Sequence, residues 1–377
     1  MAVAVQALRG VHDGQRSFTV VGADALPISF VEAFLRHLVA LGYSPNTVKA
    51  YAHDLADLFT WLRFRRREWR TLTVADVGEW VAWLRLPGPA RQGRIGVLPS
   101  VEPAVSERTL QRKLAAVSAF YGFHRRLDPG ITLQLTRWDR GFSSSGYQPF
   151  LAHTRRHQAR QEVRVRGVIR TVPEVVEADD YQLLLDACGR LRDRFLLQLL
   201  RATGMRIGEA LGLRHEDLSI ARREVAVTPR LNDNGARVKR WKPRTVPAPA
   251  ALFSGYGDYL DEEYGDLDSD FVFVNLWAPP RGHAMTYAAA RDVLLRLRQR
   301  TGLDGFTFHH LRHTYATDLI RKGTDSDWAI VAHLLGHSSI QTTLGIYGHL
   351  TVEDARRALI AAGWLTPQPV ETLEPSS

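Results

Sequence analysis

The sequence Phe308-His309-His310-Leu311-Arg312-His313 is the most informative stretch of this chain, and Leu335-Gly336-His337 and Ile346-Tyr347 follow it. Arg206 adds a second arginine far upstream. Guanidinium groups bind phosphate oxygens through paired hydrogen bonds, imidazoles transfer protons near neutral pH, and a phenol can act as a nucleophile. Together these residue types indicate a site that attacks a phosphodiester without a metal ion.

The pattern His309-x-Leu311-Arg312-His313, followed by Leu335-Gly336-His337 and Tyr347, resembles the C-terminal signature of the tyrosine recombinases, the phage integrase family. The upstream segment Ala202-Thr203-Gly204-Met205-Arg206-Ile207-Gly208-Glu209-Ala210-Leu211 resembles the box that carries this family's first arginine. Three boxes in the right order, with a lysine-bearing hairpin between the first two, are hard to obtain by chance. The chain is therefore identified as a member of this family.

The resemblance implies a mainly α fold with a small antiparallel β-sheet, in which an N-terminal helical core-binding domain grips DNA and a C-terminal domain is catalytic. Four stretches before residue 130 carry apolar residues at helical spacing, which supports the first domain directly. Helix-start signals precede these stretches: a capping box of Ser29 and Glu32, Ser44 before Pro45, Thr73, and Ser106. Strands are predicted at 224–228, 236–240, 244–249 and 271–274.

The domain organisation follows from these patterns and from composition. We expect an N-terminal extension (1–24) to which no element is assigned, a helical DNA-binding domain (25–130), a basic linker (131–175), a catalytic domain (176–365) and a disordered tail (366–377). The segment from 137 to 170 holds eight arginines against Asp139 and Glu162. Such a run is either simply solvated or lies along a phosphate backbone.

The resemblance assigns the reacting groups. Tyr347 is the expected nucleophile, and Arg206 and Arg312 are expected to hold the non-bridging oxygens of the scissile phosphate. The interval from His337 to Tyr347 is one residue longer than in many family members. Glu209 lies three residues after Arg206, where its carboxylate can hold the guanidinium in place.

Proton transfer is assigned in the same way. His309 and His337 match family positions that contact the phosphate, with His309 as the acceptor of the phenol proton, and His313 is expected to support the helix. A hairpin lysine protonates the leaving 5′ oxygen in the family. Here Lys239 has the better spacing, while Lys242 falls in the turn and remains an alternative.

Two pairs of histidines have a spacing that could bind a metal ion. His309 with His313, and His333 with His337, have the i, i+4 spacing of zinc ligands. Neither pair has a nearby cysteine, the first lacks the glutamate of His-Glu-x-x-His, and the arginines would repel a cation. We therefore expect no metal and no cofactor. Tyr315 is expected in the core.

Composition is compatible with this function. The 377-residue chain has a formal charge of +9, which favours a polyanionic partner. Its single cysteine, Cys188, cannot form an internal disulfide, and no run approaches the roughly 18 apolar residues of a membrane span. With no signal-peptide pattern at the start, a soluble protein of the bacterial cytoplasm is expected.

Three functions remain open at this point. The first is a site-specific DNA recombinase or integrase that works through a 3′-phosphotyrosyl intermediate for a mobile element, with double-stranded DNA as partner. The resemblance implies a homotetramer on synapsed DNA, with room for an accessory recombinase or host proteins. The second is strand relaxation like that of a type IB topoisomerase, and the third is a catalytically silent architectural DNA-binding protein.

Overall fold

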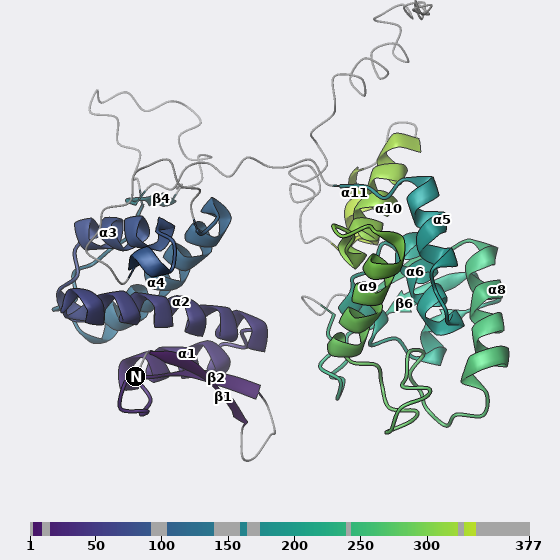
Figure 1. Cartoon of the computed structure of the whole chain (residues 1–377), viewed down its shortest axis with the longest axis horizontal. Coiled ribbons are helices and arrows are strands. Elements are labelled where there is room, and N and C mark those ends of the chain that lie inside the picture. Colours follow the sequence, from purple (N-terminus) through teal and green to yellow (C-terminus); the bar gives the residue numbers. More distant parts are fainter. Residues whose placement is uncertain are drawn as a thin grey trace, which may run out of the picture. The chain divides into compact units, whose positions relative to one another are not determined.

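The computed structural model describes residues 3–9, 16–91, 104–138, 159–163, 174–238, 243–322 and 328–336. The chain forms two compact units, Met1–Ile169 and Arg170–Ser377 (Figure 1). None of the helices in the described ranges has the length and apolar character that a membrane crossing requires.

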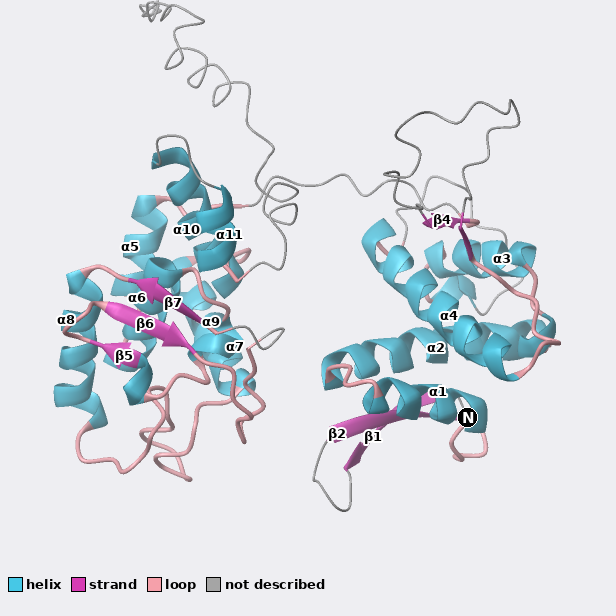
Figure 2. Ribbon diagram, turned by 180° about the vertical axis from the view of Figure 1, so that it is seen from behind, coloured by secondary structure: helices cyan, strands magenta, loops and turns pink. Residues whose placement is uncertain are grey.

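The first unit is built around four helices, as the apolar spacing predicted. These are α1 (Ser29–Ala40), α2 (Pro45–Arg65), α3 (Val74–Arg85) and α4 (Glu107–Leu127). Helix α2 lies in the middle, with α1 on one side and α3 and α4 on the other (Figures 1 and 2). The core between them includes Trp61, Trp80 and Phe120, which are fully buried.

The helix-start predictions were right for three helices and wrong for one. The Ser44 hydroxyl accepts from the Thr47 amide at 3.2 Å, with Pro45 opening α2. Thr73 forms a capping box with Asp76, and Ser106 caps α4. In α1 the N-cap is Ile28 and no side chain caps the helix, so the predicted box of Ser29 and Glu32 does not form. Ser29 is already inside the first turn, one residue too late to accept the bonds of an N-cap.

The first 25 residues, to which the sequence assigned no element, contain an antiparallel hairpin of β1 (Ala4–Arg9) and β2 (Arg16–Val21). The hairpin packs on α1 and α2, and Val20 is completely buried in the same core as the helices. A second short pair, β3 (Thr136–Trp138) with β4 (Ala159–Gln161), lies in the arginine-rich segment. The hairpin of β1 and β2 therefore belongs to the core of the first unit.

The second unit is helical with one three-stranded sheet. Its helices are α5 (Ala178–Asp186), α6 (Leu191–Thr203), α7 (Ile207–Ala210), α8 (Ala250–Tyr259), α9 (Tyr287–Thr301), α10 (Phe308–Lys322) and α11 (Trp328–Leu334). The strands β5 (Leu218–Ser219), β6 (Glu224–Val227) and β7 (Arg244–Pro247) form an antiparallel sheet in that order (Figure 2). Helix α6 packs against both α8 and α10, so the core is centred on it.

Two predicted strands are not formed within the residues that the structure describes. The described part of 236–240 is irregular, because side chains rather than a neighbouring strand bond its backbone: the Ala236 amide donates to the Asn234 side chain, and its carbonyl accepts from the Asn232 side chain. The 271–274 segment makes only isolated bridges to Arg214 and Ala284. Its backbone bonds alternate between two partners, so no ladder is built.

Candidate active site

The turn after α6 places the first arginine. Gly204 ends α6 with φ of +61°, and a Cβ built there would lie 2.2 Å from the Cδ1 atom of Tyr315. A residue without a side chain is therefore required in both conformation and space. The turn buries Met205 and leaves the Arg206 side chain 27% exposed at the start of α7. Tyr315 is buried, as expected from the sequence.

Glu209 joins Arg206 to a second guanidinium. Its carboxylate accepts from the Arg206 amide at 2.9 Å and from Arg206 Nη1 at 3.0 Å. The same carboxylate accepts from Arg244 Nη2 at 2.6 Å and from Arg244 Nη1 at 3.3 Å. Burial alone would raise the pKa of Glu209, but the hydrogen bonds and charge of Arg244, with those of Arg206, outweigh it and lower the pKa. Glu209 is therefore ionised at neutral pH.

Arg312 connects the ends of two helices from its position on α10. Its Nη1 donates to the carbonyl of Gly204 at 2.7 Å, and its Nη2 donates to the carbonyl of Leu335 at 2.5 Å. The residue is 2% exposed. Arg312 therefore fixes both the turn that carries Arg206 and the turn that leads to His337.

His309 and His313 lie one turn apart on α10, with their ring centroids 4.4 Å apart in an edge-to-face arrangement. Desolvation, followed by the charges of Arg312 and Arg206, lowers the pKa of His309 to about 4, although the residue as a whole is exposed. Desolvation and the neighbouring His309 lower the pKa of His313 to about 4. Both rings are therefore neutral at pH 7, and His309 lies close enough to both arginines to be affected by their charge.

Arg244 is a residue of the site that was not predicted from the sequence. The strand that contains it was predicted, and its residues alternate between buried and exposed, with Arg244 and Val246 buried. An arginine at an inward-facing position of an alternating strand requires a buried partner. The inward-facing position of Arg244 on this strand is a sequence signal for a buried ion pair, although it does not identify Glu209 as the partner.

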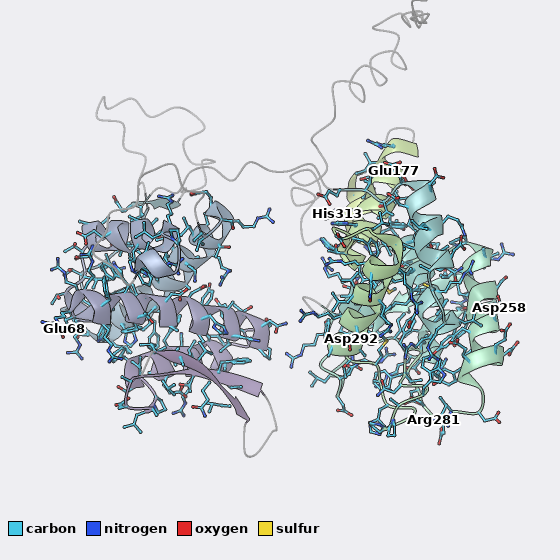
Figure 3. All side chains as sticks on the ribbon, viewed as in Figure 1. Glu68, Glu177, Asp258, Arg281, Asp292 and His313 are labelled. Carbon is cyan, nitrogen blue, oxygen red and sulfur yellow. The ribbon has the colours of Figure 1, made fainter. Side chains whose placement is uncertain are left out.

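The described site carries excess positive charge. Arg206 and Arg244 share one carboxylate, Glu209, and Arg312 adds a third guanidinium to the site, while the two histidines are neutral at pH 7. Such a site suits a phosphate anion. Within the described part of the chain, no three His, Cys, Asp or Glu side chains are grouped to hold a metal ion. Figure 3 labels His313 of this site, and it labels Asp258 and Arg281 on other parts of the second unit.

Four of the expected site residues, Lys239, Lys242, His337 and Tyr347, lie outside the described residues. The described residues end at Val238 just before the two lysines, and at Gly336 just before His337. Gly336 has φ of +61°, and a Cβ there would lie 2.8 Å from Arg244 Nη1. The described site thus brings together Arg206, Glu209, His309, Arg312 and His313.

Most of the chain is similar to proteins of one family. Residues 174–354 match the phage integrase family, and residues 31–127 match the phage integrase N-terminal SAM-like domain. The chain is 33% identical over 328 residues to transposase A from transposon Tn554 of Staphylococcus aureus, covering 86% of this chain and 88% of the relative. It is 28% identical over 330 residues to tyrosine recombinase XerC of Roseiflexus sp. (strain RS-1), covering 85% and 88%.

Solved structures share the fold. The Tn1549 transposon integrase in complex with transposon right end DNA aligns with a TM-score of 0.58 at 17% identity, over 88% of this chain and 98% of that one. The XerH site-specific recombinase bound to a palindromic difH substrate aligns with a TM-score of 0.56 at 19% identity, over 85% and 80%.

Proposed function

Because this chain belongs to the phage integrase family of tyrosine recombinases, we propose that it cuts and rejoins DNA at specific sites for a mobile element, through a 3′-phosphotyrosyl intermediate. The observation that carries the proposal is the cluster of Arg206, His309 and Arg312 from two distant segments. Arg206 and Arg244 share the single carboxylate of Glu209, so positive charge exceeds negative charge at this ion pair. The charge matches a phosphodiester, whose transition state carries its negative charge on the non-bridging oxygens.

The reaction is a transesterification. The Tyr347 phenol oxygen forms a bond to the scissile phosphorus as the bond to the 5′ oxygen breaks, leaving a 3′-phosphotyrosyl ester and a free 5′ hydroxyl. His309, neutral at pH 7, accepts the phenol proton, and Lys239 donates a proton to the departing 5′ oxygen. A 5′ hydroxyl from the partner duplex then reverses the chemistry. The ester conserves the energy of the broken bond, so no ATP is needed.

The arginines have different tasks in this scheme. Arg206, with 27% of its side chain exposed, is assigned the direct contact with the phosphate oxygens. Arg312 is 2% exposed and is assigned a contribution of positive charge to the site, while its hydrogen bonds hold the two turns. His337 is assigned a second hydrogen bond to the phosphate, with His313 packing against His309.

We extend the proposal to assembly. Exchange between two duplexes requires two paired sites, so four copies of the chain are expected on synapsed DNA. A lambda integrase tetramer bound to a Holliday junction shares the fold, with a TM-score of 0.51 at 17% identity. An accessory recombinase or host proteins would take part, and the reaction would occur in the bacterial cytoplasm.

A covalent-adduct assay tests the chemistry. The protein is incubated with labelled DNA from the ends of its element, and adducts are separated on a denaturing gel. Tyr347→Phe should abolish the adduct while DNA binding persists, and Tyr315→Phe, which removes a hydroxyl but keeps a buried ring, should retain it. An adduct that survives Tyr347→Phe would exclude Tyr347 as the nucleophile.

Two further conditions separate the alternatives. Cleavage should continue in EDTA, because the scheme uses arginine and lysine where other nucleases use metal ions. Relaxed plasmid without recombinant products would favour strand relaxation like that of a type IB topoisomerase. DNA binding without any adduct would favour an architectural role.

A further inference from the structure

Arg244 is a buried arginine whose hydrogen bonds reach two separate parts of the site. It opens β7, is 7% exposed, and places both terminal nitrogens of its guanidinium on the Glu209 carboxylate. Its third nitrogen, Nε, donates to the carbonyl of Leu334 at 2.8 Å. One planar group therefore connects α7 to the end of α11.

Each connection ends next to an assigned reacting residue. Glu209 is the carboxylate that holds the amide and guanidinium of Arg206. Leu334 lies three residues before His337, and the left-handed turn at Gly336 packs directly against the Arg244 guanidinium. A Cβ at Gly336 would overlap Arg244 Nη1, so the close approach depends on the glycine.

We propose that Arg244 is a positioning residue for strand transfer. Through Glu209 it holds Arg206 facing the phosphate, and through the Leu334 carbonyl it holds the start of the segment that carries His337 and Tyr347. This inference rests on the proposed function, because it concerns the geometry of that same site. Arg244 is nearly buried and its hydrogen bonds go to protein groups, so its effect on the phosphate passes through other residues.

The geometry requires arginine specifically. A planar guanidinium can donate to both oxygens of a carboxylate and to a carbonyl at the same time, whereas an ammonium is a point charge that cannot match the carboxylate fork. Without Arg244, Glu209 keeps Arg206 as its ion-pair partner in the buried site. Arg206 would then be drawn inward toward the carboxylate and away from the phosphate.

The test compares Arg244→Ala and Arg244→Lys with Arg192→Ala. Arg192 is an equally buried arginine of the same unit, 7% exposed, that bonds Asp193 and the Val274 carbonyl. It thus controls for the loss of a buried ion pair away from the site. The substrate is a nicked duplex of the element's end, used under single-turnover conditions with saturating protein, so that cleavage is measured apart from binding.

We expect cleavage to fall about 100-fold in Arg244→Ala, the scale of a reacting group displaced by about 1 Å. Arg244→Lys should recover about tenfold of this loss, because it restores the charge but not the fork. DNA affinity should change little, and guanidinium ions added to Arg244→Ala should restore part of the rate. Equal cleavage rates in Arg244→Ala and Arg192→Ala would overturn the assignment.

A second measurement does not depend on activity. Hydrogen exchange of the DNA-free protein should become faster in Arg244→Ala within 204–211 and 329–336, and not in Arg192→Ala. Unchanged protection in those two segments would refute the positioning role even if the wild-type protein forms an adduct. Failure of the proposed function has a different signature, since the wild-type protein would then form no adduct at all.

Discussion

At the scale of single residues, Glu209 determines the charge balance of the site. It is a fully buried carboxylate that two guanidinium groups share. Removing one member of a buried ion pair leaves an uncompensated charge in a medium that solvates it poorly. Its neutralisation should therefore destabilise the second unit as well as disturb Arg206.

Glu209→Gln should lower the free energy of unfolding by about 3–5 kcal/mol, the usual cost of breaking a buried pair. Urea titration followed by circular dichroism measures the change. Glu216→Gln is the matched control, because Glu216 pairs with Arg230 at the surface and should change stability by less than about 1 kcal/mol. Similar losses in the two variants would show that Glu209 is not held as the structure indicates.

The two α10 histidines should make stability depend on pH. Their pKa values are about 4 in the folded protein and about 6.5 in the unfolded chain, so between these limits the unfolded state binds more protons. Above about pH 6.5 both states are neutral at these positions and the histidines have no effect. The free energy of unfolding should fall as the pH is lowered from about 6.5 to 4.

Urea midpoints measured across this pH range test the prediction. A variant with both His309→Gln and His313→Gln should lose less stability between pH 7 and pH 4.5 than the wild-type protein. Parallel curves for the two proteins would place the titration at other groups.

What the sequence predicts at this scale depends on how far apart the partners are. The spacing of Arg206 and Glu209 indicated their contact, because residues three apart on a helix are neighbours. Arg244 lies 35 residues after Glu209, and only the folded chain shows that they pair. The same applies to the Arg312 bond to the Gly204 carbonyl, which spans 108 residues.

At the scale of elements, the four helices of the first unit were predicted, whereas two predicted strands were wrong in the residues that the structure describes. Apolar spacing and caps are local signals, and they located α1 to α4 within a few residues. The residues 236–238 and 271–274 have strand-like composition, but the side chains of Asn232 and Asn234 or two different backbone partners take their hydrogen bonds. Strand formation depends on such partners, which no local pattern specifies.

The turn at the end of α6 gives the prediction at this scale. Gly204→Ala should lower the free energy of unfolding by about 2–4 kcal/mol, combining left-handed strain with overlap on the Tyr315 ring. Gly235→Ala provides the control, since Gly235 has φ of +75° and no atom within 4 Å of the added Cβ. It should lose only about 1–2 kcal/mol, from strain alone. Thermal or urea unfolding compares the two, and equal losses would mean that the Tyr315 ring moves aside.

At the scale of the whole molecule, the two units have separate cores. One core includes the hairpin and α1 to α4, and the other includes α5 to α10. The arginine-rich segment precedes the second unit in the sequence. The separation was foreseeable from the change of pattern and the charge of that segment. The hairpin's place in the first core was not, because a two-stranded hairpin is stable only where it packs on something else.

Independent cores predict independent folding. Fragments 1–169 and 170–377 should each show their own cooperative urea transition by circular dichroism, because each retains its complete core. A break within α6 provides the control, since it divides one core and should leave both pieces unfolded. A fragment 170–377 that unfolds without cooperativity would show that its core needs the rest of the chain.

Arg312 and Arg244 donate hydrogen bonds to the carbonyls of Leu335 and Leu334. These bonds anchor the chain at the point where the C-terminal segment begins. Tyr347 follows Gly336 by eleven residues, and a fully extended segment of that length spans at most about 36 Å. The chain length alone therefore keeps the phenol within that distance of Gly336 and of the guanidinium groups that hold the two carbonyls. Such a covalent tether raises the effective concentration of the phenol near the guanidinium groups. We expect this effect to be lost if the hydrogen bonds to the two carbonyls are broken.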